Sequence, residues 1–211
     1  MFEQNTLKGA YFAVAAYGFW GIAPIYFKLL TRVNPLEILS HRVVWSVILL
    51  YGLLGLTGQF STLKIGGRKL LILAGTALLL STNWLIFIYA VVNDNIVEAS
   101  LGYFINPLFS VFLGMVFLKE SLRPLQWLAI LIAGAGILLQ LILFGEFPLL
   151  AIGLALTFGL YGLLRKNLSL PSAAGLALET TMVLPLALGF LAVQYHSDAL
   201  SFGPADVSTS V

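Results

Sequence analysis

The chain has 211 residues, of which 60% are hydrophobic and 9% are charged, with a formal net charge of +2 and no cysteine. An ordinary soluble domain carries about 25% charged residues, so this chain has too few charges to cover a surface in water and is predicted to be a membrane protein. The missing cysteines exclude disulfides and thiolate metal sites, and the small net charge argues against nucleic acid as a partner.

Seven apolar segments are long enough to cross a bilayer, which takes about 20 residues in a helix. They are residues 9–30, 36–57, 69–92, 97–118, 124–143, 147–164 and 174–195. The connections are mostly short, so consecutive helices are expected to be antiparallel neighbours. The predicted fold is an all-α polytopic membrane helix bundle, followed by a polar tail at 196–211 that is expected to be disordered.

The first segment is expected to remain as a membrane span. Only the four residues GAYF separate Lys8 from an AVA sequence that resembles a cleavage site, which is too short for the apolar core of a signal peptide.

Basic residues are distributed unevenly between the two ends of these helices. If the N-terminus is cytoplasmic, the inner segments hold eight of the eleven basic residues: Lys8, Lys64, Arg68, Lys69, Lys119, Arg123, Arg165 and Lys166. The outer side has Arg32, with Lys28 at its rim and Arg42 inside the second span. The positive-inside rule therefore predicts a cytoplasmic N-terminus.

The sixth segment resembles the first. The sequence YGFWG at 17–21 matches FGLYG at 158–162, and in both copies the next segment carries a polar group about one turn inside it, His41-Arg42 in one and Glu179 in the other. Because the copies are five helices apart, they would enter the membrane from opposite faces. This is the pattern of the inverted repeats found in secondary transporters.

Ionisable groups inside spans are costly and by default mark a functional path. Arg42 lies ~9 Å into its segment and needs a partner or water, unless it extends to the outer headgroups. Glu98 starts the fourth segment from the same side, where it could pair with Arg42 or cap its own helix. Glu179 is the counterpart from the opposite side.

Further candidate solute-binding residues lie beside these charges. Tyr103 and Asn106 are ~8–12 Å below the outer entrance and offer hydrogen bonds, although Asn106 could serve only to join helices. Trp20 and Trp45 offer flat apolar contacts or ordinary packing, and Asn83 lies midway along the third segment.

Two residues are assigned structural roles. Pro107 removes an amide donor from the fourth segment, so this helix is expected to break and to face the bundle interior, unless the proline is only a tolerated kink. Glu120 is expected to bond the N-terminus of the fifth helix or to lie in a solvated cytoplasmic turn. Small residues at Ala151, Ala155 and Gly159 predict a face for tight helix packing.

Motifs of other function classes are missing from the sequence. It has no H-E-x-x-H, G-x-S-x-G or P-loop motif, so no enzyme, catalytic residue, metal or cofactor is predicted. Seven helices suggest a receptor or a rhodopsin, but the last segment has no lysine for a retinal Schiff base and the predicted orientation is opposite to that of receptors.

Several stretches closely resemble the RarD subfamily of the EamA-type drug/metabolite transporters. They are AAYGFWGIAPIYFKLL, EILSHRVVWS, EASLGYFINPL and LGMVFLKESLRPLQWLAILIAGAGILLQL, and the resemblance covers roughly residues 8–190. It implies a bacterial inner-membrane permease with ten helices in two inverted five-helix repeats, moving small organic metabolites or drugs by alternating access. It also implies a link to chloramphenicol sensitivity or resistance.

On this basis, residues 1–143 are expected to form a complete first repeat and 144–195 two helices of a second repeat, as in a C-terminally truncated chain. The alternative is a non-transporting remnant of such a permease. The expected partners are the lipid bilayer, a small-molecule solute, a coupling ion and, in one reading, a second copy of the chain.

Overall fold

The computed structural model describes residues 2–201, which form seven α-helices and one short 3₁₀ helix. The α-helices are α1 (Phe2–Lys28), α2 (Pro35–Leu56), α3 (Gly67–Val92), α4 (Ile96–Leu118), α5 (Pro124–Phe144), α6 (Leu149–Lys166) and α7 (Ser172–His196), with η1 (Phe60–Leu63) before α3. All seven are long and apolar enough to cross a membrane. The predicted all-α fold and its seven spans are therefore confirmed. Most of the expected tail, residues 202–211, lies outside the described residues.

Local sequence signals account for the helix ends. Pro35 opens α2, where its missing amide hydrogen is not needed, and the Asn34 side chain accepts a hydrogen bond from the Leu36 amide at 2.9 Å. Gly145 ends α5 in the left-handed conformation, with φ at 74°, which glycine adopts without steric cost. The turns predicted from composition thus lie where the backbone requires them.

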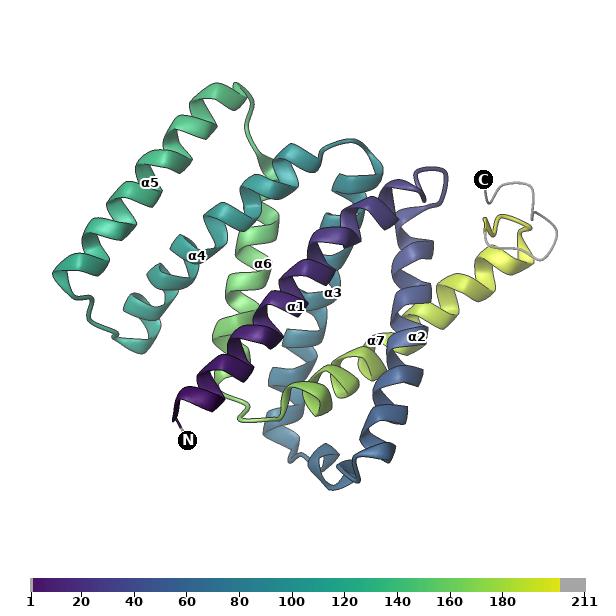
Figure 1. The fold of residues 1–211 in the computed structure, drawn as a ribbon. Coiled ribbons are helices and arrows are strands. Elements are labelled where there is room, and N and C mark those ends of the chain that lie inside the picture. Colours follow the sequence, from purple (N-terminus) through teal and green to yellow (C-terminus); the bar gives the residue numbers. More distant parts are fainter. Residues whose placement is uncertain (1, 202–211) are drawn as a thin grey trace.

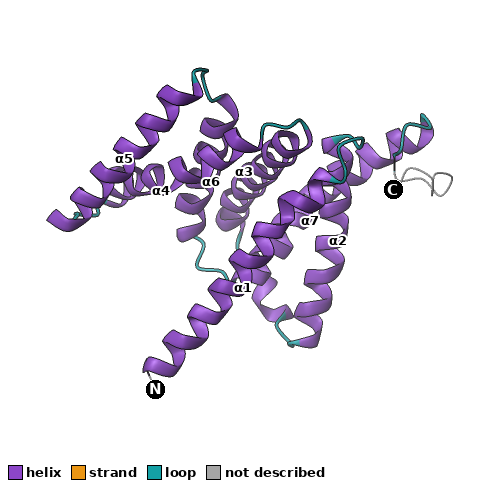
Figure 2. Cartoon of the chain, turned by 45° about the horizontal axis from the view of Figure 1, so that its top comes forward, coloured by secondary structure: helices purple, strands orange, loops and turns teal. Residues whose placement is uncertain are grey.

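The helices pack in an order that differs from their order along the chain. Helix α4 packs along α6, α2 packs along α7, and α3 lies between them in contact with both α6 and α7. Figures 1 and 2 both show α5 at one edge of the bundle, beyond α4, and α2 with α7 at the other. Helices α6 and α7 are therefore inserted among the earlier helices.

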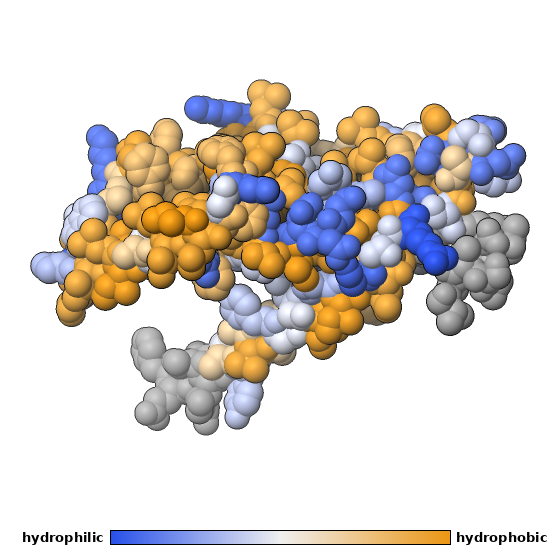
Figure 3. All heavy atoms as spheres, turned by 90° about the horizontal axis from the view of Figure 1, so that it is seen from above, coloured by the Kyte–Doolittle hydropathy of each residue, from blue (hydrophilic) through white to orange (hydrophobic). Residues whose placement is uncertain are grey.

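The exterior of the bundle is largely apolar. Figure 3 shows hydrophobic side chains over much of the visible face, with hydrophilic ones gathered in places between them. Helix α5 contributes no buried residue at all, and Leu131, Ile132 and Leu138 are each more than 60% exposed. Such surfaces are stable in hydrocarbon and costly in water, as expected of a membrane protein.

The face where α4 meets α6 is built from small residues. Ala151, Ala155 and Gly159 are all buried there. Opposite them, a Cβ atom placed on Gly102 would lie 3.0 Å from the Ala151 carbonyl oxygen. The predicted packing face on α6 is therefore used, and its partner is α4.

The expected break in α4 is not present. The helix runs without interruption through Pro107, which lies exposed rather than in the bundle interior. A proline costs one backbone hydrogen bond, and the helical turns on either side, whose Gly102 and Gly114 are buried, hold the helix together. The tolerated-proline alternative describes this position better.

A buried carboxylate joins the segment that follows α7 to the beginning of α2. Glu37 is fully buried, and its Oε1 accepts a hydrogen bond from the Ser201 amide at 2.9 Å. Nothing in the sequence pattern predicts this contact, which spans 164 residues.

Candidate functional site

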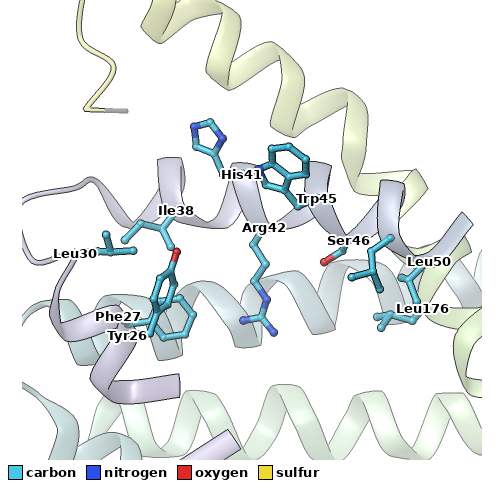
Figure 4. A pocket seen from close by; sticks show the side chains of 11 residues that line it. Tyr26, Phe27, Leu30, Ile38, His41, Arg42, Trp45, Ser46, Leu50 and Leu176 are labelled. Carbon is cyan, nitrogen blue, oxygen red and sulfur yellow. The ribbon is translucent and has the colours of Figure 1, made fainter. Parts of the chain in front are cut away.

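A cavity of about 640 Å³ opens between the end of α1, the part of α2 from Ile38 to Leu50 and the start of α7. Its walls are mainly apolar and aromatic, including Tyr26, Phe27, Ile38 and Trp45. Figure 4 shows Arg42 extending from α2 away from the side on which His41 and Trp45 lie. The cavity therefore has a mainly apolar lining and one guanidinium group.

Arg42 is held against aromatic rings and lacks an acidic partner. Its guanidinium carbon lies 4.0 Å from the Trp84 ring centroid and 5.7 Å from that of Trp20. Its Nη1 is buried and has no hydrogen-bond partner among the described residues. The ion pairs of the described chain are Lys28–Asp94, Arg165–Glu179 and Lys166–Glu120, so Arg42 is in none of them.

An aromatic cluster from three helices supports this guanidinium. Phe87 of α3 stacks on Trp20 of α1 with centroids 5.6 Å apart, and meets Tyr103 of α4 edge-on at 5.8 Å. Through Phe87, Tyr103 joins the group of rings over which Arg42 lies. Three candidate residues from separate helices, Trp20, Arg42 and Tyr103, are thus brought together.

The two residues that complete the cluster, Trp84 and Phe87, are missing from the candidate residues chosen from the sequence. They are three positions apart on α3 and therefore lie on one face of that helix. The paired aromatic spacing beside Asn83 is the signal that could have identified them.

Comparison with known proteins gives the family. The model of the EamA-like transporter family matches residues 7–142, well over half of the chain. The chain belongs to the EamA-like transporter family. Within it, the chain is 45% identical over 213 residues to the protein RarD of Escherichia coli, a match that covers 100% of this chain and 69% of the relative. This confirms the resemblance to the RarD subfamily, and with it a multi-pass protein of a bacterial membrane.

Other relatives of this EamA chain are named as a transporter or as RarD. It is 50% identical to an uncharacterized transporter of Vibrio cholerae, over 90% of this chain and 64% of the relative. It is 35% identical to the chloramphenicol-sensitive protein RarD of Pseudomonas aeruginosa, over 87% of this chain and 64% of the relative. The chain spans about two thirds of the length of these relatives. No solved structure matches it.

Glu98 does not pair with Arg42, and it lies in the first turn of its own helix, α4. Its Oε1 accepts a hydrogen bond from the Leu150 amide, at 2.7 Å. That amide belongs to the first turn of α6, where backbone N–H groups lack helical partners and the helix dipole favours a negative charge. Glu98 therefore lies at the N-terminal ends of two helices, in the first turn of α4 as expected and at the Leu150 amide of α6.

Glu120 lies exposed in the turn between α4 and α5, as one of the two expectations had it, and does not bond the start of α5. Its carboxylate accepts a hydrogen bond from Lys166 at the end of α6, at 2.7 Å, instead of bonding the start of α5. At the N-terminus of α5, the Gln126 side chain accepts a hydrogen bond from the Arg123 amide instead, at 2.8 Å. Glu120 therefore ties the α4–α5 turn to α6.

The hydrogen bonds of the two candidate asparagines are made with residues other than Arg42. Asn83 donates to the Leu154 carbonyl at 3.0 Å and to the Thr157 hydroxyl at 2.9 Å, which joins α3 to α6. Within the part of the chain that the structure describes, Asn106 accepts a long hydrogen bond from Ser110 of its own helix, at 3.4 Å. In this arrangement Asn83 joins two helices, the role that was considered for Asn106.

Trp45 and Glu179 occupy separate places. Trp45 lines the cavity and is 66% exposed. Glu179 is buried between α6 and α7, outside the cavity, and pairs with Arg165. Among the described residues, no group of three His, Cys, Asp or Glu side chains could hold a metal ion.

Proposed function

We propose that this chain acts as a bacterial inner-membrane permease for small amphipathic organic molecules, with an anionic group of the solute bound at Arg42. The observation that supports this proposal is the environment of the Arg42 guanidinium, which lies over the Trp84 ring. Among the described residues, its Nη1 is buried without a hydrogen-bond partner and Arg42 takes part in none of the ion pairs.

The charge of Arg42 selects the chemistry of the ligand. Burying a cation is costly unless an anion or hydrogen-bond acceptors replace the lost water. The planar guanidinium donates two parallel hydrogen bonds to a carboxylate or phosphate, while its ring contacts with Trp84 and Trp20 fix its orientation. An incoming anion would therefore supply what the described chain does not.

The rest of the cavity selects an apolar body. Its volume of about 640 Å³ lies in the middle of the range of small-molecule sites, which extends over about 300–1,000 Å³. Tyr26, Phe27 and Trp45 offer ring faces to the solute. Chloramphenicol-like aromatic compounds are one class to test, because one relative is named a chloramphenicol-sensitive protein.

The proposed mechanism is alternating access with the N-terminus in the cytoplasm. In this proposal residues 1–143 form the first five-helix repeat and residues 144–195 belong to a second repeat. The packing of α6 and α7 against α2, α3 and α4 supports the division, because it creates an interface between the two parts. An ion or exchange gradient would supply the energy.

The test is a binding titration of the purified chain in lipid nanodiscs, with tryptophan fluorescence as the readout. We expect aromatic carboxylates to quench the signal and Arg42→Gln to weaken binding at least tenfold. Arg68→Gln, which removes an exposed charge at the opposite end of the bundle, should bind as the parent does. Equal binding by both variants would refute Arg42 as the anion site.

Transport itself is tested separately in proteoliposomes. Uptake or exchange of a bound solute would support the permease. Binding without any movement of solute would favour the alternative, a membrane protein of this family that does not transport by itself or that functions only as an oligomer.

A further inference from the structure

A second buried charge cluster lies where α6 ends and α7 begins. Glu179 of α7 is 1% exposed, and its Oε1 lies 3.7 Å from Nε of Arg165, whose side chain is 15% exposed. The Tyr161 hydroxyl donates to the other carboxylate oxygen at 3.4 Å. The charge distribution assigned Arg165 to a cytoplasmic turn, yet this side chain is folded back into the bundle.

The contacts of this carboxylate with Arg165 and Tyr161 are long. Oε1 of Glu179 and Nη1 of Arg165 are both buried without a hydrogen-bond partner among the described residues. A carboxylate removed from water is stable only when close partners compensate for its lost hydration. With contacts of 3.4–3.7 Å, a neutral carboxylic acid competes well with the ion pair at this position.

The Arg165 guanidinium lies in a space that Gly175 leaves open, and it makes a second contact. Gly175 lies one turn before Glu179 on α7, and a Cβ atom there would overlap the Arg165 guanidinium. The Nη2 atom of Arg165 donates to the Pro171 carbonyl at 3.3 Å, in the turn that precedes α7. The guanidinium can therefore keep a hydrogen bond at Pro171 when its contact with the carboxylate is lost.

We propose that Glu179 is a proton-binding site. A proton from water at the α6–α7 end of the bundle binds the carboxylate, the resulting neutral acid no longer attracts Arg165, and the guanidinium stays on the Pro171 carbonyl. Loss of the proton restores the ion pair and draws α6 and α7 together again.

Glu179 faces groups of α6, α3 and α2. Helix α6 supplies Arg165 and Tyr161, and α3 supplies the polar Thr76. Helix α2 supplies Val43, while its Tyr51 lies near Thr181, at 3.1 Å. The short helix η1, with the sequence FSTL, brings no ionisable side chain. Arg165 is thus the cation that competes with the proton.

The proton site adjoins the Arg42 site. Glu179 and Trp84 line one small void between α2, α3 and α7, and Arg42 lies over the Trp84 ring. A proton on Glu179 would leave Arg165 without its anion, and this added positive charge would favour an anion on Arg42 in the same interior. Proton-coupled movement of an anionic solute follows, and this last step alone rests on the proposed function.

The test measures the proton without any solute. The purified chain in lipid nanodiscs is brought from mildly alkaline to mildly acidic pH while infrared spectra are recorded. We expect a protonated carboxyl band that shifts in D₂O, is lost in Glu179→Gln and remains in Glu120→Gln, which alters the half-exposed carboxylate paired with Lys166. Because no solute is present, the result stands even if Arg42 binds nothing.

A band of unchanged size in Glu179→Gln, or no band in the parent chain, would overturn the proposal. If Glu179→Gln does not fold, the same infrared measurement on Arg165→Gln tests the proposal. Without its cation, the carboxylate should give a stronger band than the parent at the same pH, and an equal band would refute the competition between Arg165 and the proton.

Discussion

At the residue scale, the charged side chains at the helix contacts are explained by their partners. Glu98 neutralises the amide end of α6, Glu120 meets Lys166, and Glu179 meets Arg165. Arg42 is the exception, because its neighbours within the described chain are rings rather than acids. A cation on ring faces keeps part of its electrostatic stabilisation while its N–H groups remain free for an added ligand.

The stacking contact predicts a defined role for Trp84. Replacing Trp84 by Leu keeps the position apolar but removes the ring from the guanidinium, a contact worth about 0.5–2 kcal/mol. We expect affinity for an anionic solute to fall about three- to thirtyfold, as measured by isothermal titration in nanodiscs. Trp127→Leu on α5 is the control, and equal losses in both variants would show that the effect is not specific to Arg42.

The cap on α6 predicts a stability effect. Glu98→Gln removes the negative charge but keeps an acceptor oxygen, so we expect a loss of about 0.5–1 kcal/mol in the free energy of unfolding, measured by denaturant titration in mixed micelles. Glu146→Gln changes an exposed carboxylate in the turn just before α6 and should leave stability unchanged. A larger loss in Glu146→Gln would contradict the assignment of the cap to Glu98.

At the element scale, α4 and α6 are joined along their whole length. Glu98 links their beginnings, Glu120 holds the end of α4 to the end of α6, and small residues allow close backbone contact between them. Close approach strengthens dispersion contacts and is the usual basis of helix association in lipid. These two helices are therefore expected to move as one body.

This packing predicts opposite effects for two glycines. A methyl group at Gly102 would meet both the Ala151 carbonyl oxygen and the Leu154 Cβ at 3.0 Å, whereas nothing lies within 4 Å of a Cβ at Gly136 on α5. We expect Gly102→Ala to destabilise the protein by about 1–3 kcal/mol. Gly136→Ala should be neutral or slightly stabilising, because alanine favours helix by about 1 kcal/mol. Thermal unfolding of both variants in the same detergent checks this, and equal midpoints would contradict a tight α4–α6 contact.

At the scale of the whole molecule, the uneven basic residues predict a cytoplasmic N-terminus. Since the chain has no cysteine, single cysteines can report the orientation directly. In intact cells, Glu146→Cys should react with a membrane-impermeant maleimide, while Ser61→Cys should react only after the membrane is opened. The reverse pattern would contradict the predicted orientation.

The sequence by itself determined the class of protein, the positions of seven spans and the family. Hydropathy and turn residues act over a few neighbouring positions, so they can be read without knowing which helices touch. The strings around YGFWG and EASLGYFINPL carried the resemblance that the comparisons confirm.

Only the tertiary structure decided the partners. Glu98 lies 52 residues from Leu150 and Asn83 lies 74 from Thr157, and nothing local to either side chain specifies such a pair. The rotation and tilt of each helix fix which side chains meet, and they are set by packing over the entire bundle. For the same reason Arg42 could be recognised from sequence as a charge inside a span, whereas its contact with the Trp84 ring could not.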